Sequence, residues 1–139
     1  MDLRELVDRS ELAEMVARHS LWIDQQRYDE TDQLFTADIA VKSRRGEAHG
    51  LQALVDVVRA SHDQYARTMH NKSNLVITVD GDTATVRAHD LAVFVIGDDK
   101  EAIAAAVHEY RARRTSDGWR FDRLEITPVA LTETLHRAL

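Results

Sequence analysis

The sequence predicts an α+β fold in which a long antiparallel sheet wraps its inner face against N-terminal helices. Apolar residues follow a helical period through most of the first half of the chain, and a strand period replaces it from about Ala66 onward. The turn sequences "DGD" at 80–82 and "SDG" at 116–118 divide the second half into two hairpins. Helices followed by a strand meander are the element order of an α+β domain.

Composition excludes several functional classes. The chain has 139 residues, which suits one domain spanning 1–139, and its 44% hydrophobic content supports a core. The net charge of -6 argues against a nucleic-acid binder. The absence of cysteine excludes thiolate chemistry. No apolar run approaches the roughly 20 residues of a membrane span, and the charged start does not resemble a secretory signal. We therefore expect a cytoplasmic protein without membrane contact.

The first helix carries the first candidate site residues. Asp8 is predicted to cap it, with Glu11 completing a capping box. His19 lies inside the apolar stripe that follows, and Asp24 lies at its edge. The stripe consists of Leu12, Met15, Val16, His19, Trp22 and Ile23. The alternatives are a buried core histidine at His19, and at Asp24 a solvated charge or a partner for an arginine such as Arg27 or Arg123.

The next segments connect this helix to the sheet. Asp29 is predicted to cap a short helix over 30–35, and 38–43 is predicted as a strand. The stretch 46–50 is predicted as a turn, and 51–64 as a third helix with one apolar face.

Four long strands follow, over 67–79, 83–96, 102–115 and 119–132. The Ala-rich stretch 102–106 has helical propensity, but the alternation that continues to Arg111 favours a strand.

Residues of equal parity point to one side of a sheet, and this places polar groups on the inner face. The inner positions of the second and third strands are rich in alanine, and small side chains facing helices leave space for a pocket. The polar residues predicted to project into that space are His70, Asn74, Asp90, His108 and Tyr110, with His19 and Asp24 from the first helix. A β-bulge would break this parity argument. His49, His62, His89 and His136 are predicted as surface or loop residues, His89 with a possible place in a subunit interface.

Three stretches resemble the SnoaL-like families of the nuclear transport factor 2-like superfamily. They are "ELAEMVARHSLWIDQQRYDETDQLFTAD", "HNKSNLVITVDGDTATV" and "VHEYRARRTSDGWRFDRLEI". The resemblance implies a cone-shaped, cystatin-like α+β barrel: a curved antiparallel sheet around a largely apolar pocket closed by N-terminal helices. It also implies a homodimer through the outer sheet face. The superfamily includes scytalone and bile acid dehydratases, polyketide cyclases, ketosteroid isomerase, limonene epoxide hydrolase and non-catalytic binders, so the fold does not decide the function.

The same resemblance assigns residue roles. Asp24 and His70 match the Asp–His pair of the dehydratase-like members, and Asp90 matches an acidic residue of bile acid dehydratase. His19 and His108 stand where many relatives have tyrosine, which weakens any transfer of substrate identity.

This set of residues supports acid–base chemistry. A histidine held by a carboxylate is a tuned general base, so Asp24, His70, Asp90 and His19 are the predicted catalytic residues. His19, His108 or Tyr110 could donate a hydrogen bond to a substrate oxygen. The predicted substrate-binding residues are Asn74, His108, Tyr110, Trp22 and Phe35, with core packing as the alternative for Trp22 and Phe35. The chemistry needs no cofactor, and the lack of a His-x-x-x-His spacing disfavours a metal.

The leading hypothesis is a cofactor-independent lyase that dehydrates a small hydrophobic hydroxy-carbonyl compound, steroid- or polyketide-like. An isomerase or cyclase would use the same proton abstraction, and a non-catalytic ligand-binding protein is the alternative class. Epoxide hydrolysis fits less well, because Arg67, Arg87 or Arg123 would have to turn into the pocket.

Overall fold

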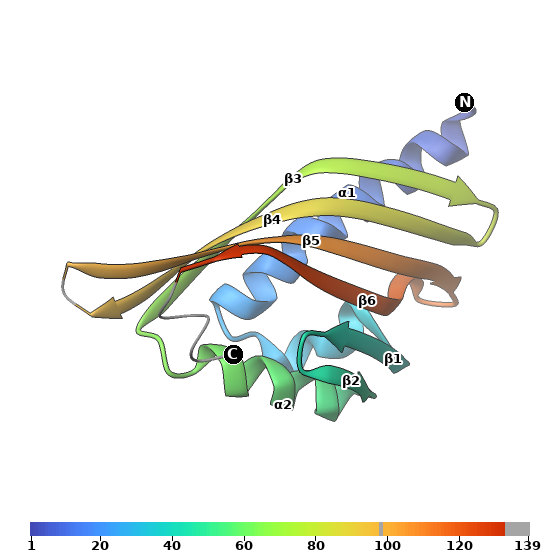
Figure 1. Ribbon diagram of the computed structural model, residues 1–139. Coiled ribbons are helices and arrows are strands. Elements are labelled where there is room, and N and C mark those ends of the chain that lie inside the picture. Colours follow the sequence, from blue (N-terminus) through green and yellow to red (C-terminus); the bar gives the residue numbers. More distant parts are fainter. Residues whose placement is uncertain (98, 133–139) are drawn as a thin grey trace.

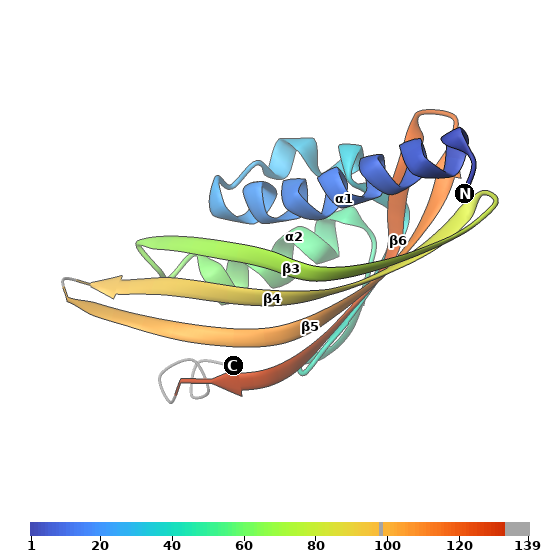
Figure 2. The ribbon, with the colours of Figure 1, turned by 90° about the horizontal axis from the view of Figure 1, so that it is seen from above.

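A curved six-stranded sheet holds two helices on its concave side (Figures 1 and 2). The computed structural model describes residues 1–97 and 99–132. The helices are α1 (Leu3–Asp24) and α2 (Leu51–His62), with a 3-10 helix η1 (Tyr28–Gln33) between them. The strands are β1 (Phe35–Ser43), β2 (Gly46–His49), β3 (Arg67–Asp80), β4 (Thr83–Gly97), β5 (Lys100–Thr115) and β6 (Gly118–Leu131).

The strand order is β2-β1-β6-β5-β4-β3. The strands β3 to β6 form the predicted antiparallel meander, and the Ala-rich stretch is part of strand β5, as the alternation indicated. One pairing was not predicted: β1 runs parallel to β6 and extends the sheet beyond the meander.

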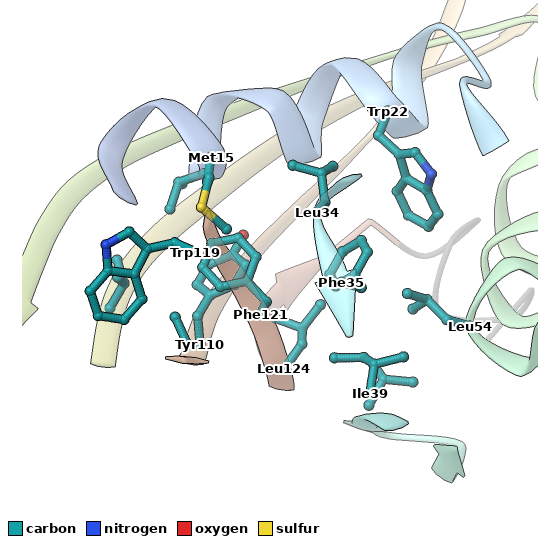
Figure 3. Close-up of a cluster of buried hydrophobic side chains, with 14 of the residues drawn as sticks. Met15, Trp22, Leu34, Phe35, Ile39, Leu54, Tyr110, Trp119, Phe121 and Leu124 are labelled. Atoms are coloured by element: carbon teal, nitrogen blue, oxygen red, sulfur yellow. The ribbon is translucent and has the colours of Figure 1, made fainter. Parts of the chain in front are cut away.

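The predicted apolar stripe of α1 faces the sheet, and all six of its members are buried. Together with η1 and β1 it covers a cluster of buried hydrophobic side chains, several of them aromatic, that packs against the sheet (Figure 3). Tyr110 and Phe121 stack there with ring centroids 4.4 Å apart, and Trp119 lies beside them.

Three local predictions were wrong. The cap of α1 is Asp2, whose carboxylate accepts a hydrogen bond from the Glu5 amide at 2.8 Å, while Asp8 is buried inside the helix. The short helix is a 3-10 helix that begins at Tyr28, one residue before the predicted cap Asp29. The predicted turn at 46–50 contains strand β2, which pairs with β1.

A β-bulge in β3 reverses the parity on which one predicted site residue depended. The register shifts between Ser73 and Val76, and Asn74 adopts a left-handed backbone with φ 55°. Asparagine tolerates this conformation better than most residues. Before the bulge His70 points inward, and after it the odd-numbered residues such as Ile77 pack against the core. Asn74 is therefore exposed, and its predicted place in the pocket is wrong.

Candidate active site

An aspartate–histidine pair joins the end of α1 to the start of β3. The Nδ1 of His70 lies 2.6 Å from Oδ1 of Asp24, and the His70 backbone amide donates to Oδ2 at 2.9 Å. The Thr68 hydroxyl also donates to Oδ1 at 2.9 Å. Burial raises the pKa of Asp24, but these hydrogen bonds outweigh it and hold that pKa below its ordinary value. Asp24 is therefore a carboxylate at neutral pH, and it fixes the proton of His70 on Nδ1.

The other ring nitrogen of His70, Nε2, is not in contact with Asp24. With Nδ1 carrying a proton, Nε2 of the neutral ring has a lone pair that can take a proton from a substrate. His70 is 8% exposed and lines a cavity, so this nitrogen works in a poorly hydrated site. The Nε2 of His62, from the last turn of α2, lies 3.2 Å from the Nε2 of His70.

A second polar cluster surrounds Asp90 on β4. The Nζ of Lys72 lies 3.0 Å from Oδ1 of Asp90 and donates to the Ser20 hydroxyl at 2.9 Å. The Lys72 side chain is 4% exposed, and burial lowers its pKa although the nearby Asp90 opposes this. Despite the ion pair, Oδ1 of Asp90 receives no well-directed hydrogen bond from the described residues. A carboxylate has about four lone-pair sites, so Asp90, with Lys72 and His108 beside it, retains the capacity to accept a hydrogen bond from a ligand.

A chain of rings leads from Asp90 to α1. His108 Nε2 lies 3.5 Å from Oδ2 of Asp90, and its Nδ1 lies 3.3 Å from the Tyr110 hydroxyl. That hydroxyl lies 2.7 Å from Nδ1 of His19. Burial, with the charge of Lys72, lowers the pKa of His108 to about 3 and that of His19 well below its usual value. Both rings are therefore neutral, and each has one nitrogen that donates and one that accepts.

These two clusters flank a cavity of about 160 Å³ between α2 and the concave face of the sheet. Its walls are formed mainly by aliphatic side chains and by Phe94, and a smaller number of polar side chains also line it. The polar lining residues are His19, Ser43, Arg44, Arg45, Ser61, His62, His70, Asp90 and His108. Across residues 1–97 and 99–132, no group of three or more His, Cys, Asp and Glu side chains is arranged to hold a metal ion.

The structure brings together most of the residues that the sequence singled out. His70 contacts Asp24 and lines the cavity. Asp90, His19 and His108 line the same cavity. The other predicted substrate-binding residues lie elsewhere: Tyr110 is behind His19 and His108, and Trp22 and Phe35 pack in the core against the far side of His19. Trp22 donates its indole N–H to the Thr31 hydroxyl at 2.9 Å, away from the cavity lining.

Two residues of this site, His62 and Lys72, were not predicted from the sequence. His62 was predicted at the surface, but it lines the cavity because it follows Leu51, Leu54, Val55 and Val58 on the same helical face. Lys72 shares the parity of His70 before the bulge, so strand alternation places it on the inner face. Of the remaining histidines, His49 and His89 are exposed as expected, and His136 lies outside the described residues.

Comparison with known proteins agrees with this architecture. The model of the SnoaL-like domain matches residues 4–125. The chain belongs to the SnoaL-like family. An uncharacterised protein of Mycobacterium tuberculosis is 28% identical over 130 residues, which cover 88% of this chain and 86% of the relative.

Solved structures place this SnoaL-like protein in the nuclear transport factor 2-like superfamily, with its cystatin-like fold. A member from Novosphingobium aromaticivorans has a TM-score of 0.80 and 26% identity, over 99% of this chain and 92% of that one. A scytalone dehydratase candidate from the same species has a TM-score of 0.82 at 23% identity, over 93% and 89%. A hexachlorocyclohexane dehydrochlorinase from Novosphingobium barchaimii has a TM-score of 0.84 at 18% identity, over 95% and 93%. The last two show the fold alone.

No helix in the described part of the chain is long and apolar enough to cross a membrane.

Proposed function

We propose that this SnoaL-like protein is a cofactor-independent lyase that removes water from a compact hydrophobic hydroxy-carbonyl compound. The observation that carries the proposal is the 2.6 Å contact between Asp24 and His70 at the wall of an apolar cavity. The carboxylate fixes the ring tautomer and stabilises the imidazolium that forms when His70 accepts a proton.

The elimination uses one histidine twice. His70 Nε2 takes the proton from the carbon next to the substrate carbonyl, and the C–H electron pair becomes the new C=C bond. The C–O bond to the hydroxyl breaks, and the departing hydroxide takes the proton from His70 as water. A neutral base converted into an acid in this way contributes on the order of 10²–10⁴ in rate.

Asp90 supplies the second point of recognition. Asp90 is 6% exposed and lines the cavity, and beside its ion pair with Lys72 it has lone pairs that no described residue uses. An ionised carboxylate only accepts hydrogen bonds, so it selects a substrate group that donates one, such as a hydroxyl. The hydroxyl of a hydroxy-carbonyl compound provides that donor. His108 directs Nε2 at Asp90 and Nδ1 at the Tyr110 hydroxyl, so it has no donor left for a substrate. If the Tyr110 hydroxyl donates to Nδ1 of His19, then Nε2 of His19 carries the proton and can donate to a carbonyl oxygen.

The cavity size narrows the substrate class. A dry cavity of about 150 Å³ accepts a benzene-sized ligand, and the volume here is about 160 Å³. This favours a single-ring compound over a steroid. Among the structural neighbours whose names describe reactions, a dehydratase candidate and two dehydrochlorinases have names that describe eliminations, which agrees with the proposal, whereas a candidate aromatic ring hydroxylase has a name that describes a different reaction.

The test uses 3-hydroxycyclohexanone and close single-ring β-hydroxy ketones. Enone formation is followed by absorbance, and exchange of the α-proton in D₂O is followed by NMR. We expect both signals with the wild type, loss of both in His70→Ala, and no change in His49→Ala, whose exposed ring is remote from the dyad. Exchange without enone formation would replace the lyase by an isomerase or cyclase. Ligand binding with neither signal would indicate a non-catalytic carrier.

The positions of three arginines bear on the alternative of epoxide hydrolysis. Arg67 and Arg87 are exposed and Arg123 pairs with Glu47 at 3.2 Å, so none of the arginines considered for epoxide opening lies between the cavity acids.

The homodimer through the outer sheet face stays a prediction. Val76, Leu91 and Ile103 are exposed apolar residues of β3, β4 and β5, and light scattering would test whether they are covered.

A further inference from the structure

His62 touches the nitrogen with which His70 would do its chemistry. The two Nε2 atoms are 3.2 Å apart and the ring centroids 5.1 Å apart. His62 comes from the last turn of α2, and Phe94 packs against both rings. A nitrogen–nitrogen contact at this distance is a hydrogen bond if one proton lies between the atoms, and a repulsion between lone pairs if none does.

The protons on the outer nitrogens decide which case applies. His70 Nδ1 faces the carboxylate of Asp24, which can only accept, so that nitrogen carries a proton. His62 Nδ1 lies 3.0 Å from the Val58 carbonyl oxygen, which also can only accept. The Ser61 hydroxyl lies 2.7 Å from the same nitrogen, and its one proton has two acceptors that cannot donate, the carbonyl oxygens of Val57 at 3.0 Å and Val58 at 3.2 Å. Ser61 is therefore an acceptor toward His62, and His62 Nδ1 carries a proton as well.

Both Nε2 atoms are thus lone-pair positions in the neutral rings, and they face each other. We propose that His62 and His70 share a single proton between their Nε2 atoms, which makes His62 a positioning residue for the proton that His70 handles. The Asp24 carboxylate balances the charge of the shared proton. Burial, with the charge of His70, lowers the pKa of His62 to about 4, which suits His62 as the acceptor of the pair.

The bridge changes what the pocket offers to a substrate. With the proton in place, the lone pair of His70 is occupied and the base is masked. Without it, the two lone pairs repel, and the His62 ring moves off to expose His70 Nε2. After His70 has taken a proton from a substrate carbon, His62 accepts a hydrogen bond from the new imidazolium and holds it until a leaving group takes the proton.

Other charged groups around the cavity contribute to the same equilibrium. Asp24 on α1 and Asp90 on β4 favour the proton, and the cationic groups around the same cavity oppose it. The cationic groups are Arg44 and Arg45, which line the cavity from the turn between β1 and β2, and Lys72 on β3. The neutral rings of His19 and His108 complete the set. None of these groups approaches the Nε2 of His70 as the Nε2 of His62 does, at 3.2 Å. The Nδ1 atoms of both rings are also already hydrogen-bonded, to Asp24 and to the Val58 carbonyl oxygen.

The first test needs no variant and no substrate. In the full chain labelled with nitrogen-15 in histidine, the imidazole nitrogen spectrum near neutral pH reports the tautomer of each ring. We expect Nδ1–H in both His62 and His70, and one proton shared by their Nε2 atoms that is lost in a single step as the pH rises. A neutral His62 with its proton on Nε2 would overturn the inference.

The second test removes the acceptor while keeping the cavity filled. A hydrogen bond from the imidazolium to His62 favours the charged form of His70. His62→Phe is therefore expected to lower the pKa of His70 by about one unit, and His62→Gln, whose amide oxygen can accept, to restore part of it. His49→Phe is the matched control. An unchanged or raised pKa in His62→Phe would overturn the inference.

This inference deepens the proposed function, because it concerns the same base, but the two fail separately. A shared proton in a protein that turns over no hydroxy-ketone removes the lyase and leaves the bridge. Turnover that depends on His70 with an unaltered titration in His62→Phe removes the bridge and leaves the lyase.

Discussion

The helix α1 carries a buried aspartate, Asp8, near its start and a half-buried aspartate, Asp24, at its end, and the two have different roles. Asp8 accepts a two-pronged contact from Arg114, at 3.0 and 2.9 Å, and a hydrogen bond from the Trp119 indole at 3.1 Å. Asp24 accepts from His70 and Thr68. Both carboxylates tie α1 to the sheet, and both have lowered pKa values.

The difference lies in the partner. A guanidinium keeps its proton at any accessible pH, so the Asp8–Arg114 pair stabilises the fold but cannot transfer a proton. An imidazole exchanges a proton near neutrality, so the Asp24–His70 pair can perform chemistry. The surroundings agree with this division: large aromatic rings fill the space near Asp8, whereas small residues such as Ala92 and Ala106 leave the cavity beside His70.

The largest expected effect separates the two aspartates by activity. Asp24→Asn removes the charge that fixes the His70 tautomer, and we expect kcat/KM on the hydroxy-ketone to fall about 10³-fold, or about 4 kcal/mol of transition-state stabilisation. Asp8→Asn should leave the rate per folded molecule within about twofold, since no step uses it. Steady-state kinetics on both variants, corrected for folded fraction, measure this. Equal losses of activity would erase the proposed division.

The second expected effect is on stability, where Asp8→Asn should cost more than Asp24→Asn. Asp8→Asn removes the charge from a buried acceptor of hydrogen bonds from Arg114 and Trp119, although Asp82 still pairs with Arg114 at 2.9 Å, and we expect the free energy of unfolding to fall by about 3 kcal/mol. Asp24→Asn, at the more accessible end, should cost about 1 kcal/mol, since the amide oxygen still accepts one hydrogen bond. Urea unfolding of the two variants gives both numbers. A larger loss for Asp24→Asn would show that the dyad is the main structural tie.

The third effect concerns the buried pair of Lys72 and Asp90. Lys72→Met leaves Asp90 as an uncompensated buried charge and should cost about 3 kcal/mol of stability. The double variant Lys72→Met/Asp90→Leu should recover to within about 1 kcal/mol of the wild type, because both desolvation penalties disappear. The thermodynamic cycle is completed by Asp90→Leu alone. Additive losses in the double variant would mean that the two charges are not coupled.

The layers and the meander could be predicted because periodic signals in the sequence specify them, whereas the pairing of Asp24 with His70 was predicted from the resemblance to dehydratase-like relatives. His70 and Asp90 were placed by strand alternation, and Asp24 by its position at the end of an apolar stripe. Asn74 was misplaced because the bulge that turns it outward arises from a backbone conformation that alternation does not encode. His62 was overlooked although its helical phase matched Leu54 and Val58, since the helix end was taken for the surface. The parallel pairing of β1 with β6 joins segments far apart in the chain, and no local pattern specifies it.

The smallest expected effect is a dependence of stability on mild acid from the neutral histidines. Burial lowers the pKa of His108 to about 3, whereas in the unfolded chain it returns to about 6.5. Between those values the unfolded state binds the extra proton, so this contribution is complete above about pH 6.5 and is lost as the pH falls toward the folded pKa. The slope is at most about 1.4 kcal/mol per pH unit for one histidine. Between pH 7 and pH 6 His108 alone should contribute a loss of about 0.7 kcal/mol. Urea unfolding at the two pH values should therefore show a loss that is smaller by about this amount in His108→Gln, and unchanged in the exposed control His49→Gln. An identical loss in His108→Gln would show that His108 titrates alike in both states, and the ring chain from Asp90 to His19 would then be hydrated rather than dry.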